Sequence, residues 1–123
     1  MKKILIESTM SSPEVVFNFG ANTLSIKGVC TPENPKLFFD PIIAAYEEYK
    51  QTHDNITIDI FLDYFNTGSS KCLLNLFIKA AANTDVNTTT INWITDSEDS
   101  ELIESGQMLE EISKLKFNYV FIN

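Results

Sequence analysis

The stretch "NITIDIFLDYFNTGSSKCLLNLFIKAAANT", residues 55–84, predicts a buried strand that runs directly into a helix. In its first part, apolar residues alternate with a mixed set, as in a strand with one buried face and one partly covered face. The apolar face consists of Ile56, Ile58, Ile60, Leu62 and Tyr64. After residue 68 the apolar spacing becomes that of a helix. We expect the buried stripe of this helix to contain Leu73, Leu74, Phe77, Ile78 and Ala81.

The segments on either side of this stretch predict further strands and helices in alternation. "EVVFNFG" (14–20) and "TLSIKGV" (23–29) are β-prone runs separated by a short turn, so they predict a hairpin. The other segments predict a helix at 37–51, a strand at 88–96, a helix at 97–115 and a last strand at 118–123. The order β-β-α-β-α-β-α-β predicts a single-domain α/β fold over residues 1–123, with a mixed sheet and right-handed crossovers between parallel strands.

The helix that follows the turn "CTPENPK", residues 30–36, contains a proline whose effect the pattern leaves open. Asn34 can cap this helix with Pro35 at its first position. Further along, Pro41 either kinks the helix or forces it to restart with Asp40 as a new cap. Both alternatives keep the helix between the hairpin and the strand at 55–65.

The charge of the chain argues against two classes of partner. Seventeen acidic residues against nine basic ones give a formal net charge of −8. Nucleic acids and anionic membrane surfaces both favour clustered lysine and arginine, so we expect neither as a partner.

The first residues, "MKKILIESTM", contain three consecutive apolar residues, whereas a signal peptide needs a run of about 7–15 apolar residues. We therefore expect a cytoplasmic protein.

Residues that could carry catalysis are few. The one histidine, His53, lies in a polar segment and has no partners for a catalytic triad nearby in the sequence. Asp59 and Asp63 share a strand face and could hold a metal, but no third ligand follows at a suitable spacing. The four glycines form no phosphate-binding loop. We expect no catalytic residue, no metal and no cofactor.

The turn at residues 66–70 is rich in side chains that can cap a helix. One cap needs one such residue, whereas Asn66, Thr67, Ser69 and Ser70 all qualify. Lys71 then places a cation in the first turn, where it opposes the helix dipole. That placement is favourable when an anion sits at the helix start, as a phosphate on Thr67 would. Simple capping and a phosphorylation or anion site both remain open from these residues alone.

Five further segments carry a family resemblance, namely "SSPEV" at 11–15, "TLSIKGVCTPEN" at 23–34, "YFNTGSSK" at 64–71, "INW" at 91–93 and "ESGQMLEEI" at 104–112. Together they resemble the SiaC-like regulatory phosphoproteins of bacteria, whose fold is similar to that of anti-sigma-factor antagonists (STAS-like domains). The specific pieces are "PEN" and "YFNT-S-K", the second within residues 64–71. The resemblance covers nearly the whole chain.

The resemblance implies a switch based on Thr67. In such proteins a dedicated protein kinase phosphorylates the matching threonine, and a PP2C-type phosphatase removes the phosphate. The unphosphorylated form binds a downstream protein, in the described case a diguanylate cyclase that makes cyclic di-GMP. We expect the phosphorylation site to be supported by Asn66, Gly68, Ser69, Ser70 and Lys71. We expect the partner surface to contain Pro32, Glu33, Asn34 and Tyr64.

Two positions depart from the family pattern. Gly68 stands where family members usually have serine, which removes one acceptor hydroxyl and loosens the turn. After Trp93 the chain reads "ITDSED", whereas the family more often has an aromatic residue two positions beyond the tryptophan. These departures bear on the identity of the partner.

Three other readings compete with the switch. A STAS-type module could hold a free nucleotide or phosphate at the helix start without covalent change. A plain scaffold would use the hydroxyls only as helix caps. A small metal-dependent enzyme would use Asp59, Asp63 and the Thr67 turn. Divalent-metal binding, ligand-induced stabilisation and phosphate incorporation distinguish these readings.

Overall fold

The computed structural model describes residues 2–82 and 88–123, which form one six-stranded sheet and three helices. The strands are β1 (Lys3–Ile6), β2 (Glu14–Asn18), β3 (Thr23–Cys30), β4 (Asn55–Phe65), β5 (Thr88–Thr95) and β6 (Phe117–Phe121). The helices are α1 (Pro35–Tyr49), α2 (Thr67–Ala81) and α3 (Ser100–Ser113). The predicted mixed α/β fold is confirmed, with one strand, β1, that the sequence pattern did not predict.

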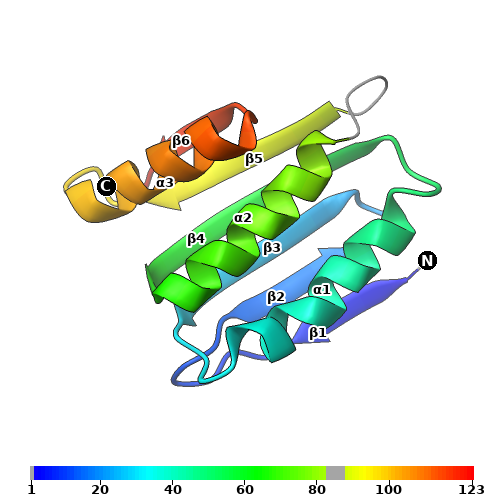
Figure 1. Ribbon diagram of the computed structural model, residues 1–123, viewed down its shortest axis with the longest axis horizontal. Coiled ribbons are helices and arrows are strands. Elements are labelled where there is room, and N and C mark those ends of the chain that lie inside the picture. Colours follow the sequence, from blue (N-terminus) through cyan, green and yellow to red (C-terminus); the bar gives the residue numbers. More distant parts are fainter. Residues whose placement is uncertain (1, 83–87) are drawn as a thin grey trace.

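The strands lie in the sheet in their chain order, β1-β2-β3-β4-β5-β6. β1, β2 and β3 pair antiparallel, and β3 to β6 pair parallel. Right-handed crossovers that all advance in one direction place every connecting helix on the same side. Figure 1 shows α1, α2 and α3 together on one face of the sheet. The carboxyl ends of β3, β4 and β5 therefore lie at the same end of the sheet, and each of these strands continues there into a helix.

The core lies between the three helices and the covered face of the sheet. Its largest fully buried side chains include Trp93, Tyr46, Tyr49, Phe17, Phe39 and Phe77. In β4 the predicted apolar face is confirmed from Ile56 to Leu62, but Tyr64 is 59% exposed. The cause is a register shift, because Gly28 pairs with Leu62 and Val29 pairs with Tyr64. One extra residue reverses the alternation of side chains, so Phe65 instead of Tyr64 packs against the core.

The buried stripe of α2 differs from the predicted one. Leu73 and Phe77 are buried as expected, whereas Ile78 is exposed. The buried positions are Ser69, Leu73, Leu76, Phe77 and Ala80. The stripe is rotated because α2 packs between α1 and α3 as well as on the sheet. Residues 83 and 84, which end the quoted stretch, lie outside the described residues.

α1 is one continuous helix, which resolves the alternatives at Pro41. Asn34 caps it through a hydrogen bond from the Leu37 amide to Asn34 Oδ1 (3.2 Å). Asp40 is not a cap, because it lies inside this helix, where its Oδ2 accepts a hydrogen bond from Lys36 Nζ at 2.6 Å. Pro41 is exposed, so the carbonyl that its missing N–H leaves unbonded can be solvated.

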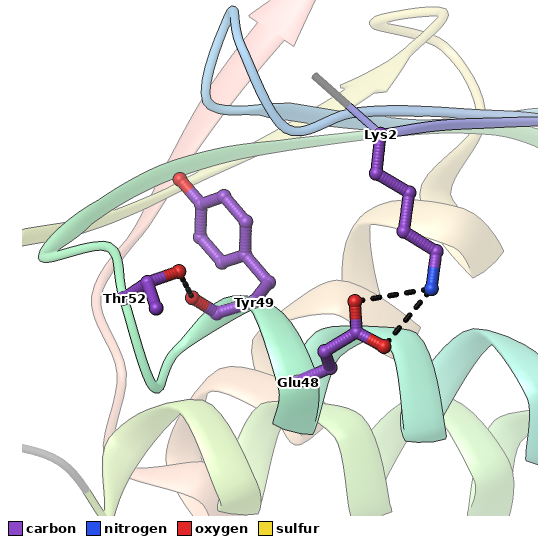
Figure 2. A network of polar contacts seen from close by, with 4 residues as sticks. All are labelled: Lys2, Glu48, Tyr49 and Thr52. Atoms are coloured by element: carbon purple, nitrogen blue, oxygen red, sulfur yellow. Dashed lines mark hydrogen bonds and ion pairs between the residues drawn. The ribbon is translucent and has the colours of Figure 1, made fainter.

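An ion pair between Lys2 and Glu48 in α1 directly precedes the short edge strand β1. Figure 2 shows Lys2 Nζ bound to both carboxylate oxygens of Glu48 in α1, at 2.9 and 3.0 Å. Both side chains are about half exposed, so this ion pair contributes at most about 1 kcal/mol. The pairing of β1 with β2 depends mainly on the sheet hydrogen bonds.

Tyr49 is buried near the amino-terminal end of β4, at the opposite end of this strand from the Thr67 turn. Its hydroxyl lies 2.7 Å from Asn22 Oδ1 and also contacts the backbone carbonyl of Asn55. Burial, with a smaller contribution from Tyr46, raises the pKa of Tyr49 to about 12. The phenol is therefore neutral in the folded protein at a pH where an unfolded tyrosine is already ionised.

The Tyr49→Phe variant is expected to be about 1 kcal/mol less stable than the wild type at pH 7, because the partly buried acceptors on Asn22 and Asn55 lose the hydroxyl that donates to them. This difference should shrink above pH 10. The unfolded wild type ionises there while folded Tyr49 keeps its proton up to about 12, so stability falls by about 1.4 kcal/mol per pH unit. Urea unfolding at pH 7 and pH 11 measures both values. Tyr64→Phe is the exposed control, and a pH-independent Tyr49→Phe difference would contradict this account.

Candidate functional site

The turn between β4 and α2 is held in place by Asn66. Its backbone N–H donates to the carbonyl of Cys30 (3.1 Å), and its Nδ2 donates to the carbonyl of Pro32 (3.3 Å). Asn66 Oδ1 accepts the Ser69 amide at 2.9 Å, which is an N-cap bond. One side chain therefore caps α2 and ties it to the turn after β3.

The hydroxyls of this turn differ in their access to solvent. Thr67 is the first residue of α2 and is exposed, whereas Ser70 is half-buried. The Ser69 side chain is fully buried, and its hydroxyl has no hydrogen-bond partner of standard geometry among the described residues. Burial also raises the pKa of the neighbouring Cys30 thiol. Of these three hydroxyls, Thr67 is the most accessible to another protein.

Gly68 packs against the first turn of α1. A Cβ atom added at Gly68 would lie 2.8 Å from Cγ of Pro35, closer than a Cβ contact normally allows. The glycine therefore lets the amino-terminal ends of α1 and α2 approach one another. The sequence pattern suggested a looser turn at this position, whereas the structure shows close packing.

A groove lies between α1 and α2 beside this packed contact, with a cavity volume of about 420 Å³. Its lining includes Pro35, Ile43, Gly68 and Cys72, together with the charged residues Lys36, Asp40 and Lys71. Among the residues at 2–82 and 88–123, Lys71 forms no ion pair. Lys36 was not singled out in the sequence, although its spacing of four from Asp40 signals an ion pair on one helix face.

On the other side of the turn, the end of β4 faces the start of α3 across a small acidic hollow of about 100 Å³. Asp63, Asp99 and Glu101 contribute to its lining, together with Tyr64. Asp99 also caps α3 by accepting the Leu102 amide at 3.1 Å. The Thr67 turn is thus flanked by an acidic surface on one side and by the lysine-bearing groove on the other.

The residues expected at the partner surface differ in exposure. Glu33 and Asn34 are exposed, and Tyr64 is largely exposed. Pro32 is buried, and its carbonyl accepts the hydrogen bond from Asn66. The "PEN" turn and the Thr67 turn are therefore in direct contact.

The residues considered for metal or enzyme chemistry are not gathered in one site. Asp59 accepts a hydrogen bond from Asn92 Nδ2 at 2.8 Å, whereas Asp63 lines the acidic hollow. His53 stacks on Tyr49 with ring centroids 4.2 Å apart, and its Nδ1 lies 3.1 Å from the Tyr49 carbonyl. Within the described ranges, no three His, Cys, Asp or Glu side chains form a cluster that could bind a metal ion.

A comparison with protein-family models gives one match over most of the chain. The model described as "SiaC family regulatory phosphoprotein" matches residues 6–122. The chain belongs to the SiaC family. A search of curated proteins finds no relative that matches this chain.

Solved structures of SiaC from Pseudomonas aeruginosa have the same fold. One similar chain comes from a crystal structure of the diguanylate cyclase SiaD in complex with its activator SiaC, with a TM-score of 0.90 at 21% identity. That alignment covers 97% of this chain and 99% of the other. A structure of SiaC has a TM-score of 0.84 at 23% identity, covering 99% and 98% of the two chains. A crystal structure of apo-SiaC has a TM-score of 0.80 at 23% identity, and the alignment covers 100% of both chains.

One departure from the SiaC family pattern lies inside the protein. Thr95, two residues beyond Trp93, is only 2% exposed, and its carbonyl accepts the Ile122 amide at 3.2 Å. Its side chain is therefore not available to a partner in this conformation.

Among the described residues, none of the helices is long and apolar enough to span a membrane.

Proposed function

We propose that this chain is a non-enzymatic phospho-switch. A dedicated protein kinase transfers the terminal phosphoryl group of ATP to Oγ1 of Thr67, which loses its proton, and ADP leaves. A PP2C-type phosphatase then uses water to return the hydroxyl and release inorganic phosphate. The unphosphorylated form binds and regulates a downstream protein in the cytoplasm. Residues 1–123 act as one regulatory domain.

The observation that carries this proposal is the position of Thr67. It is an exposed hydroxyl at the first position of a helix, in a member of a family of regulatory phosphoproteins. Asn66 already caps the helix, so Thr67 is not needed for capping. This favours modification over the simple capping reading.

The local field also suits an added phosphate. The first backbone N–H groups of a helix have no intrahelical acceptors. Asn66 Oδ1 accepts the hydrogen bond of the Ser69 N–H, but it does not accept from the N–H groups of Thr67 and Gly68. Lys71 stands four residues after Thr67, so the two side chains share one face of α2. Phosphothreonine carries about −1.5 to −2 charges, which these donors and this cation partly compensate.

The first candidate for the downstream protein is a diguanylate cyclase, and the output would be cyclic di-GMP. Support comes from the P. aeruginosa complex, in which SiaC is described as the activator of the diguanylate cyclase SiaD. In our proposal Glu33, Asn34 and Tyr64 contact the partner, and Pro32 holds the turn beneath them. Exposed residues around Thr67 would then sense its modification directly.

Phosphate incorporation at Thr67 is the direct test of this function. The purified chain is incubated with ATP and an extract of cells of its own organism, and the intact mass is measured. We expect one added phosphoryl group on the wild type and on Ser70→Ala, and none on Thr67→Ala. Tandem mass spectrometry places the group. An adduct that persists in Thr67→Ala, or a wild type that is never modified, would reject the proposal.

A further inference from the structure

The groove between α1 and α2 combines an apolar floor with cations at its rim. Pro35, Ile43 and Cys72 supply apolar surface, and the cavity of about 420 Å³ is large enough for a side chain of another protein. Lys36 and Lys71 stand at the same groove. Apolar surface and fixed charge in one concave site favour an occupant that carries both an apolar and an acidic group.

The charges at this groove run against those of the whole chain. Lys36 pairs with Asp40 at 2.6 Å, and this carboxylate raises the pKa of Lys36. Lys71 has no such partner among the residues at 2–82 and 88–123. Lys36, Asp40 and Lys71 therefore give the groove a net charge of about +1. The whole chain has a formal net charge of −8. An acidic occupant is complementary to this point of an otherwise acidic protein.

Thr67 lies on the helix face that leads to the groove. Gly68, Lys71, Cys72 and Asn75 line the groove from α2, and Lys71 is one turn beyond Thr67. On the opposite side, the acidic hollow of Asp63, Asp99 and Glu101 repels an anion. This arrangement of charges would direct a phosphate on Thr67 toward Lys71, which lines the groove.

We propose that the α1–α2 groove is the docking site for a partner segment that carries an apolar side chain beside a carboxylate, and that a phosphate on Thr67 competes with this carboxylate for Lys71. This inference rests on the proposed function and adds the chemistry of the partner segment. In the unmodified chain the carboxylate binds Lys71 while the apolar side chain fills the groove. In the modified chain the phosphate takes Lys71 from its own helix and repels the partner's acid.

A peptide titration tests this docking chemistry in the full chain. The probe is the peptide acetyl-Leu-Glu-Glu-Leu-amide, and its control is acetyl-Leu-Gln-Gln-Leu-amide. Amide shifts of the ¹⁵N-labelled chain are followed by NMR up to about 10 mM peptide, since weak contacts of a few kcal/mol bind in the millimolar range. We expect shifts centred on Gly68, Lys71, Cys72 and Asn75, and at least threefold weaker binding of the control peptide.

Variants then test the role of the lysine. Lys71→Gln should weaken binding of the acidic peptide at least threefold and remove its preference over the control peptide. Lys116→Gln removes the same charge at an exposed position after α3, and it should bind like the wild type. Phosphothreonine placed at residue 67 by genetic encoding should abolish the shifts. Absent or scattered shifts, or equal binding by Lys71→Gln, would overturn the inference.

The two proposals fail in different ways. Loss of the groove shifts in the unmodified chain would reject the docking chemistry, even if mass spectrometry places a phosphate on Thr67. Groove binding that responds to Lys71→Gln, in a chain that its own cells never phosphorylate, would instead reject the switch. In that case the competition part of the inference is rejected with it.

Discussion

A chain with phosphothreonine at residue 67 is expected to bind its downstream partner about a hundredfold more weakly than the unmodified chain. Burying a dianion in an interface without a matched cation costs several kcal/mol. Lys71 offsets part of this cost, so we expect about 2–3 kcal/mol to remain, and each 1.4 kcal/mol is tenfold in affinity. We expect the fold to be unchanged by this modification, because Thr67 is exposed and Asn66 supplies the cap of α2.

Isothermal titration with a diguanylate cyclase of the same organism, the partner proposed above, measures this loss. Phosphothreonine at residue 52, an exposed position just beyond the end of α1, is the charge-matched control and should leave the affinity unchanged. Thr67→Ala should bind like the wild type, and Thr67→Glu should lose less affinity than phosphothreonine because its charge is smaller. Equal affinities of the modified and unmodified chains would defeat the switch mechanism.

The Gly106→Val variant is expected to lose about 2–3 kcal/mol of stability, which is near the upper end for overpacking a core. A Cβ atom at residue 106 would lie 2.7 Å from Nε1 of Trp93 and 2.8 Å from its Cε2. The indole cannot retreat easily, because Nε1 donates to the Leu102 carbonyl at 2.9 Å. The ring also stacks on Phe117 with centroids 5.8 Å apart.

Valine suits this test because its intrinsic helix propensity differs little from that of glycine, so the measured loss reports the steric clash. Gln107→Val is the control, since residue 107 is exposed on the same helix. Urea unfolding gives both free energies. We expect the control to change stability by less than about 0.5 kcal/mol. A Gly106→Val loss no greater than that of the control would show that α3 can move away from the sheet.

Local sequence rules predicted several features of this protein correctly. Asn34 with Pro35 marked the start of α1, and the helix predicted at 97–115 contains α3, which spans Ser100–Ser113. The alternation from Ile56 to Leu62 defined the buried face of β4. These features depend on neighbours a few residues apart, which the sequence displays directly.

Features that depend on distant partners were missed or wrong. β1 is four residues long and alternates weakly, so it forms only because β2 offers a partner. Tyr64 is exposed because a register shift against β3 changes the side-chain alternation. The stripe of α2 is rotated because two neighbouring helices also bury it. None of these effects is visible within a window of a few residues.

For the candidate site, the sequence by itself determined the residue types: an asparagine, a threonine, two serines and a lysine within residues 66–71, directly after a buried strand. Only the tertiary structure decided which hydroxyl is accessible, because burial of Ser69 follows from how α2 lies on the sheet. It also decided that Gly68 touches Pro35 and that Lys36 and Lys71 share a groove. The reason is physical: composition and spacing fix local hydrogen bonds, whereas exposure and grooves arise where segments far apart in the chain pack together.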